Sequence, residues 1–156
     1  MLDIIIPGRK KLQLKYLLLD FNGTMAQDGL LPKRIAKDLL KIGKKLEIHI
    51  ITADTYETVE NQIKAIPVKF KIINKGDQES QKMNYVRELG KENCVAIGNG
   101  SNDTQMLKEA SLGIAVLDPE GCSVQAILKA DILVTNIEKA FELLLKPVRI
   151  KATLRT

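Results

Sequence analysis

The chain has 156 residues, of which 45% are hydrophobic and 28% charged, and its formal net charge is +5. This length and composition fit one globular domain with a real core and exclude a disordered chain. No apolar run approaches the ~18 residues of a membrane-spanning helix, and residues 1–7 lack the basic region of a signal peptide. Cys94 and Cys122 have no metal-ligand spacing, and the apolar run after Cys94 favours a buried, reduced thiol. We therefore expect a cytoplasmic protein.

The positive charge is spread along one predicted helix and toward the C-terminus. Nucleic-acid binding would need a concentrated basic patch, ideally with stacking aromatic side chains. The chain has only three Tyr, three Phe and no Trp, and none lies among the basic residues of the C-terminal segment. We expect no nucleic-acid partner, and only mild attraction of anionic small molecules.

Apolar runs alternate with helical patterns along the chain. Residues 2–6 and 12–14 flank a short basic turn and predict a hairpin. The strands predicted after it are 16–20, 46–52, 68–73, 95–98, 113–116 and 132–134. The predicted helices are one that begins near Pro32 after a loop over 25–31, then 55–65, 78–89, 103–110, 123–130 and 137–145. Gly90 ends the third of these helices and Pro147 stops the last.

This repeated strand–helix alternation predicts an α/β fold. The expected architecture is a Rossmann-like, three-layer α/β/α sandwich with a mostly parallel sheet, because nearly continuous apolar strands are buried on both faces. No insertion is long enough for a second domain or a cap. We expect one domain over residues 1–156, with an N-terminal hairpin at 1–14 and a C-terminal tail at 147–156.

The segment Asp20-Phe21-Asn22-Gly23-Thr24 directly follows the first central strand. Open α/β sheets place their ligand chemistry at the carboxyl ends of the strands. There Asp20 could attack or chelate a phosphate, while Gly23 and Thr24 supply a flexible turn and a hydroxyl. Asp20 could also be no more than a turn-capping residue.

Three further polar groups fall at strand ends or at the helix starts that follow. Thr52 ends the second strand, Lys82 lies near the start of a helix, and Gly98-Asn99-Gly100-Ser101-Asn102-Asp103 follows the fourth strand. Phosphoryl transfer needs a nucleophile, cations and positioned donors, and these residues supply all three. The residues expected to contact a substrate are Phe21, Gly23, Thr24, Thr52, Ala53, Lys82 and Asn102, with the backbone amides of Phe21, Asn22 and Ala53 among the donors.

Each of these assignments has a structural alternative. Thr52 could be a displaced helix cap, and Lys75 competes with Lys82 for the cationic role. The segment 98–103 could be only a tight strand-to-helix turn with Asp103 in the first helical turn. His49 lies between Ile48 and Ile50 on a buried strand, so we expect a structural role for it.

Taken in this order, the four groups resemble the motifs of the haloacid dehalogenase-like phosphohydrolase superfamily, roughly from Tyr16 to Val134. The resemblance implies Asp20 as nucleophile and Mg²⁺ as cofactor. By the same resemblance the catalytic positions are Asp20, Asn22 and Lys82, and the metal contacts are Asp20, the backbone carbonyl of Asn22, Asn99 and Asp103.

Two positions depart from the pattern. Many members have Asp where this chain has Asn22 and Asn99. Asn cannot titrate, so Asn22 cannot protonate a leaving group or activate water. Loss of both charges should also weaken Mg²⁺ binding. These departures make the chain similar to the small soluble P-type ATPase-like branch, whose first motif has a non-acidic residue at the equivalent place.

The sequence therefore predicts a capless, Mg²⁺-dependent phosphohydrolase or phosphotransferase that acts on a small phosphorylated substrate. The alternative is a degenerate relative that binds a phosphorylated ligand or partner without efficient turnover. We also expect a homo-oligomer that partly closes the open cleft, with the apolar run Ile4-Ile5-Ile6 as a candidate contact.

Overall fold

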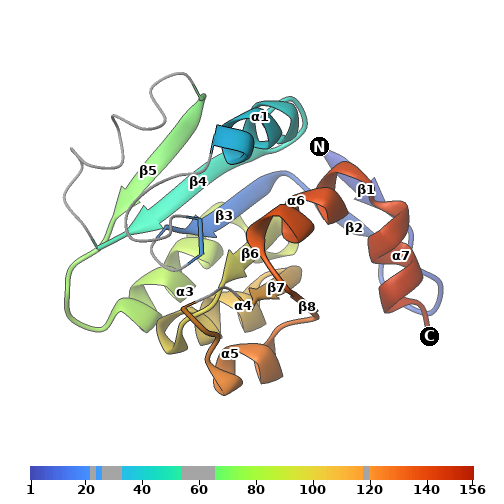
Figure 1. Cartoon of the computed structure of the whole chain (residues 1–156). Coiled ribbons are helices and arrows are strands. Elements are labelled where there is room, and N and C mark those ends of the chain that lie inside the picture. Colours follow the sequence, from blue (N-terminus) through green and yellow to red (C-terminus); the bar gives the residue numbers. More distant parts are fainter. Residues whose placement is uncertain (22–23, 26–32, 54–65, 118–119) are drawn as a thin grey trace.

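The computed structural model describes residues 1–21, 24–25, 33–53, 66–117 and 120–156. The sheet within these ranges has six strands in the order β5-β4-β3-β6-β7-β8, and every neighbouring pair is parallel (Figure 1). The strands are β3 (Tyr16–Asp20), β4 (Glu47–Thr52), β5 (Val68–Ile72), β6 (Cys94–Gly98), β7 (Leu112–Val116) and β8 (Ile132–Val134). The chain order reverses between β3 and β6, so these two adjacent strands mark the switch point at which open α/β sheets bind ligands.

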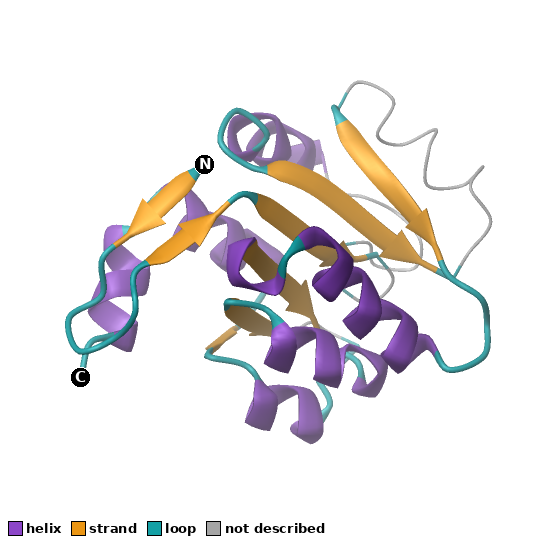
Figure 2. Ribbon diagram, turned by 180° about the vertical axis from the view of Figure 1, so that it is seen from behind, coloured by secondary structure: helices purple, strands orange, loops and turns teal. Residues whose placement is uncertain are grey.

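Helices cover both faces of this sheet. The described helices are α1 (Lys33–Ile42), α3 (Gln78–Leu89), α4 (Thr104–Glu109), α5 (Val124–Lys129), α6 (Ile137–Leu145) and α7 (Val148–Leu154). Helices α1 and α6 pack on one face, and α3, α4 and α5 pack on the other (Figures 1 and 2). The three-layer α/β/α fold is therefore confirmed.

The pleat of β3 divides the core into two layers. Leu17 and Leu19 pack in the layer that contains α1 and α6, whereas Leu18 packs against α3 and α4. Successive side chains of a strand point to opposite faces, so Asp20 has the same parity as Leu18. The end of β3 therefore directs Asp20 toward α3.

The boundaries of the predicted elements agree with the structure to within a few residues. The segment predicted as a helix from Asp103 begins with a 3-10 turn over Ser101–Asp103, and α4 follows it. The predicted helix over 55–65 lies outside the described residues, as does most of the predicted loop over 25–31. Among the described residues there is no second domain or cap.

The N-terminal hairpin forms a small separate sheet. Strands β1 (Leu2–Ile4) and β2 (Leu12–Leu14) pair antiparallel, and α7 lies beside them (Figure 1). Ile4 and Ile6 are buried in the main core, whereas Ile5 is 69% exposed. The run expected to form a contact between subunits thus exposes one of its three isoleucines, and homo-oligomerisation stays a prediction.

The last residues form a helix, which the sequence analysis did not predict. Pro147 ends α6 but also precedes α7, because its fixed φ suits the start of a helix. Ile150 and Leu154, four residues apart, are buried in the core cluster that includes the hairpin. The C-terminal segment therefore packs on the domain as a helix.

Candidate active site

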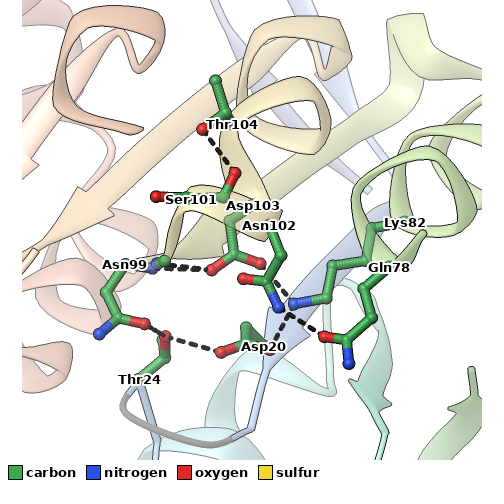
Figure 3. Close-up of polar contacts among 10 residues, drawn as sticks. Asp20, Thr24, Gln78, Lys82, Asn99, Ser101, Asn102, Asp103 and Thr104 are labelled. Atoms are coloured by element: carbon green, nitrogen blue, oxygen red, sulfur yellow. Dashed lines mark hydrogen bonds and ion pairs between the residues drawn. The ribbon is translucent and has the colours of Figure 1, made fainter. Parts of the chain in front are cut away.

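Asp20 and Lys82 meet at the carboxyl end of β3. The Lys82 ammonium donates to Asp20 Oδ1 over 2.7 Å (Figure 3). Lys82 shares the buried face of α3 with Val86, one helical turn later, which places its side chain over the sheet. The structure therefore pairs Lys82, rather than Lys75, with the predicted nucleophile.

Asp103 holds the other side of Lys82. Its Oδ1 accepts from Lys82 Nζ over 2.6 Å, and its Oδ2 accepts from the backbone amides of Asn99 and Gly100 over 3.0 and 2.9 Å. A Cβ at Gly98 would lie 2.5 Å from the Asp103 carboxyl group, so a side chain there would displace this carboxylate. The predicted tight turn is therefore present, and its backbone amides also hold the Asp103 carboxylate in place.

Thr24 connects the first and fourth motifs. Its hydroxyl lies 3.3 Å from Asp20 Oδ2 and 3.1 Å from Asn99 Oδ1, and Asn99 Nδ2 donates to the Gly121 carbonyl over 3.1 Å (Figure 3). Two acceptor oxygens therefore face one hydroxyl, which can donate to one of them at a time. Asp20 and Asn99 are 79 positions apart in the sequence. They lie close together because Asp20 ends β3 and Asn99 follows the adjacent strand β6.

These groups open into a cleft of about 430 Å³. Its described lining consists of Asp20, Thr52, Ala53, Lys75, Gln78, Lys82, Asn99, Gly100 and Asn102. Thr52 is 3% exposed and ends β4, directly after Ile51, the residue that pairs with Asp20. Asp103 does not line the cleft, so it lies behind Lys82.

The sequence analysis missed Gln78 and assigned no cleft position to Lys75. Gln78 begins α3, and its Oε1 accepts from Asn102 Nδ2 over 2.7 Å. This bond joins α3 to the turn after β6 at the mouth of the cleft (Figure 3). The position of Gln78 at a helix start was the available sequence signal, but the sequence could not show that the helix starts above Asp20.

The predicted residues fall into three groups. Asp20, Thr24, Thr52, Ala53, Lys82, Asn99, Asn102 and Asp103 are gathered at or directly behind the cleft. Phe21 is buried with its side chain in the core, and its carbonyl accepts from the Met25 amide over 3.0 Å. Asn22 and Gly23 lie outside the described residues.

The buried charges of the site influence one another. Burial, followed by the nearby Asp103 carboxylate, raises the pKa of Asp20 to about 7, and Lys82 opposes this shift. Burial disfavours the charge of Lys82, but Asp20 and Asp103 outweigh it, so the pKa of Lys82 lies above its ordinary value. When Asp20 and Asp103 are both ionised, their two negative charges and the one positive charge of Lys82 leave the buried site with a net negative charge.

This donor set fits a hard divalent cation. The available atoms are carboxylate and amide oxygens, which Mg²⁺ prefers, and the local negative charge favours a cation. Asp20 and Asn99 line the cleft and each places an oxygen near the Thr24 hydroxyl, whereas the Asp103 side chain has no exposed surface and does not line the cleft. Within the described residues there is no cluster of three or more His, Cys, Asp or Glu that could hold a metal. The oxygens of Asp20 and Asn99 are therefore the direct ligand candidates, and Asp103 suits an indirect role.

His49 fixes α3 to the sheet. It is 2% exposed, and its ring nitrogens lie 2.7 Å from the Tyr85 hydroxyl and 2.8 Å from Glu47 Oε1. Tyr85 follows Lys82 by three residues on α3, so this contact supports the helix that carries Lys82. The contacts fit the structural role expected for His49.

The profile of the haloacid dehalogenase-like hydrolases matches residues 37–131. The chain belongs to this family. The matched range contains Thr52, Lys82 and the turn with Asp103, and Asp20 precedes it. An uncharacterized protein of Methanocaldococcus jannaschii is 45% identical over 84 residues, which cover 51% of this chain and 90% of that protein.

Solved structures share the fold of this family member. A 3-deoxy-D-manno-octulosonate 8-phosphate phosphatase from Moraxella catarrhalis, in complex with magnesium, phosphate and the octulosonate, has a TM-score of 0.72 and 21% identity over 89% of this chain and 90% of that chain. The cobalt-bound Haemophilus influenzae phosphatase of the same name has a TM-score of 0.72 and 13% identity over 92% and 94%.

A zinc-transporting PIB-type ATPase has a TM-score of 0.62 and 21% identity, covering 80% of this chain and 20% of that chain. At these identities the likeness shows the fold alone. In the described part of this chain, no helix is long and apolar enough to cross a membrane.

Proposed function

We propose that the chain is a Mg²⁺-dependent phosphohydrolase or phosphotransferase that forms an aspartyl-phosphate on Asp20. The observation that carries this proposal is the Asp20–Lys82–Asp103 arrangement, with contacts of 2.7 and 2.6 Å, at the edge of a polar cleft. The side chain of Asp20 keeps 11% exposure while Lys82 keeps 1% and Asp103 none. Asp20 is thus the acid that can reach a substrate, and the other two residues orient it.

In the first step the Asp20 carboxylate attacks phosphorus, and the bond between phosphorus and the ester oxygen breaks. The departing alkoxide takes a proton from water, because Asn22 has none to give. Lys82 balances negative charge at the nucleophile, and the Thr52 hydroxyl can donate to a phosphoryl oxygen. A bound Mg²⁺ would supply charge neutralisation between the carboxylate and the phosphate. Attack of water on the aspartyl-phosphate then returns free Asp20 and inorganic phosphate.

The substrate class is a small phosphomonoester. The cleft is polar and modest in volume. A protein with the same fold is named as a phosphatase of 3-deoxy-D-manno-octulosonate 8-phosphate, which is a small phosphomonoester. The proposal is tested by a screen of phosphosugars, phosphorylated acids, acyl phosphates and ATP. Mg²⁺ is added at about 5 mM, so that even a site of weak affinity is occupied. Release of phosphate from any of them that requires Asp20 supports it.

We expect the metal to bind weakly and reversibly. The described site offers Asp20 as its one cleft-facing carboxylate, and Asn99 contributes an uncharged oxygen. EDTA should suppress turnover, and Mg²⁺ should restore it with a half-maximal concentration near the millimolar range, about 10⁻⁴–10⁻³ M or above. The measurement is phosphate release during a Mg²⁺ titration. Full activity in chelator, or restoration by trace Zn²⁺ alone, contradicts this prediction.

The substitution Asn22→Asp should increase phosphomonoester hydrolysis. It restores a titratable group at the position where the resemblance places the general acid and base, and such a group contributes about 10²–10⁴-fold. The gain should be largest for alkyl phosphates, which need protonation, and small for acyl phosphates and nitrophenyl phosphate. The measurement is kcat/KM across leaving groups of graded pKa. An equal effect on every leaving group contradicts an acid–base role.

Asn22 and Asn99 also support a second candidate function, binding of a phosphorylated ligand with little turnover. This candidate predicts that phosphorylated ligands raise the melting temperature while no phospho-donor labels Asp20. Detection of an acid-stable, hydroxylamine-sensitive phosphoryl group on Asp20 excludes it in favour of the enzyme.

A further inference from the structure

Lys75 lies at the mouth of the cleft, on the segment that leads into α3. It lines the cleft together with Asp20, Thr52 and Lys82. Lys82 is occupied by Asp20 and Asp103, at 2.7 and 2.6 Å. Lys75, in contrast, has no ion pair or hydrogen bond to another residue in the described ranges. Among the cleft residues described, Lys75 therefore carries the positive charge that is not balanced within the protein.

The backbone around Lys75 is held in place. Gln81 on α3 accepts from the Asn74 amide over 2.9 Å and donates to the Asn74 carbonyl over 3.3 Å. Asp77 caps α3 by accepting from the Ser80 amide over 3.3 Å, with its own φ at 42° in the left-handed region that Asp tolerates better than most residues. Because these bonds fix both ends of the segment, Lys75 is presented at the cleft with little backbone freedom to lose on binding.

Apart from Lys75, the residues described at the mouth of the cleft are uncharged. Gln78 and Asn102 bond to each other across it at 2.7 Å, and Ala53 completes the described rim. Lys82 and Thr52 lie beside Asp20 and suit the transferred phosphoryl group. Lys75 is thereby left to meet the part of the substrate that extends out of the cleft.

We propose that this cleft takes phosphomonoesters whose leaving group carries a second anionic group, a carboxylate or another phosphate, and that Lys75 binds that group. The inference rests on the proposed function, since it names the substrate class of the same site. Lys75 is a specificity-determining residue in this account. A charge-assisted hydrogen bond of this kind corresponds to about 10–100-fold in affinity.

Two matched substrate pairs test it. 3-Phosphoglycerate and glycerol 3-phosphate differ by a carboxylate, and fructose 1,6-bisphosphate and fructose 6-phosphate differ by a second phosphate. We expect kcat/KM to favour the more anionic member of at least one pair by about 10-fold or more, mainly through KM. The pair that shows the preference identifies the anionic group as carboxylate or phosphate.

Lys75→Met should reduce this preference at least about 10-fold, and Lys75→Arg should retain most of it. Lys108→Met, the same change at an exposed position of α4, is the matched control and should keep the wild-type preference. An equal loss for both members of each pair would mean that Lys75 contacts the transferred phosphoryl group, and it overturns the inference while leaving the proposed function in place. Absence of any preference in the wild-type chain overturns it as well.

A binding measurement separates the inference from the proposed function. Isothermal titration with 3-phosphoglycerate, glycerol 3-phosphate and the two fructose phosphates uses the Asp20→Asn variant with Mg²⁺, in which chemistry is blocked. We expect tighter binding of the more anionic member of at least one pair, and loss of that difference on adding Lys75→Met. If the wild-type chain hydrolyses nothing, the proposed function fails, but this binding difference still supports the inference and its absence overturns it.

Discussion

Asp20→Asn should abolish turnover, with a fall in kcat of at least about 10⁴-fold. The amide has nearly the same shape but cannot attack phosphorus, and no other acid lines the described part of the cleft. The measurement is phosphate release under conditions in which the wild-type chain is active, together with mass spectrometry of the protein after incubation with acyl phosphate. Wild-type protein should gain one phosphoryl group at Asp20, and the variant should gain none.

The stability of this variant separates lost chemistry from lost structure. Burial and Asp103 raise the pKa of Asp20 to about 7. Above that pH the folded protein holds an ionised Asp20 in a buried place, and this lowers the free energy of unfolding. The neutral amide removes this cost, and we expect the melting temperature at pH 8 in EDTA to equal or exceed that of the wild type. Asp3→Asn at the exposed hairpin is the matched control and should keep full activity. Turnover by Asp20→Asn near the wild-type rate would disprove the nucleophile assignment.

Lys82→Met should both inactivate and destabilise the protein. Its ammonium contacts two buried carboxylates, and removing one partner of a buried ionic group costs about 3–5 kcal/mol because the remaining charges are left uncompensated. Activity should fall by about 10²–10³-fold, as for loss of one strong donor to a reacting group. The measurement is the free energy of unfolding in urea at pH 8 in EDTA, alongside kcat at saturating substrate.

The destabilisation by Lys82→Met should depend on pH. The pKa of Asp20 is already raised to about 7 in the wild type, and loss of Lys82, which lowers it, must raise it further. A folded-state pKa above the unfolded value, 3.8 for Asp, means that the folded protein gains stability as protons bind. The variant should therefore become more stable as the pH falls from 8 toward 5, and its difference from the wild type should shrink.

Two further variants separate the loss of the Lys82 charge from a general effect of the substitution on folding. Lys108→Met is the matched control on an exposed face of α4 and should change stability by no more than about 0.5 kcal/mol at either pH. Lys82→Arg retains the charge and should be folded at pH 8, even if Lys82→Met is not. A Lys82→Met protein as stable as the wild type at pH 8 would show that the charge contact contributes little.

The strands, most of the described helices and the four motifs could be predicted from local sequence patterns. These features are local: Tyr16–Asp20 is an apolar run followed by a polar turn, and each later motif stands at the end of a strand or at a helix start. A parallel sheet then brings strand ends to a common edge, so Asp20, Thr52 and the turn with Asp103 could be expected near one another. Apolar periodicity and chain order were sufficient for that expectation.

Which side chains meet in the site could not be predicted from the sequence and became clear in the folded chain. Lys75 and Lys82 were both plausible cations by sequence, and Lys82 reaches Asp20 because it shares the sheet-facing side of α3 with Val86. The helix α7 was missed because Ile150 and Leu154 give too little periodicity in so short a segment, and burial with the hairpin stabilises it. Contacts between residues distant in the chain depend on how helices pack on the sheet, and short-range patterns do not contain that information.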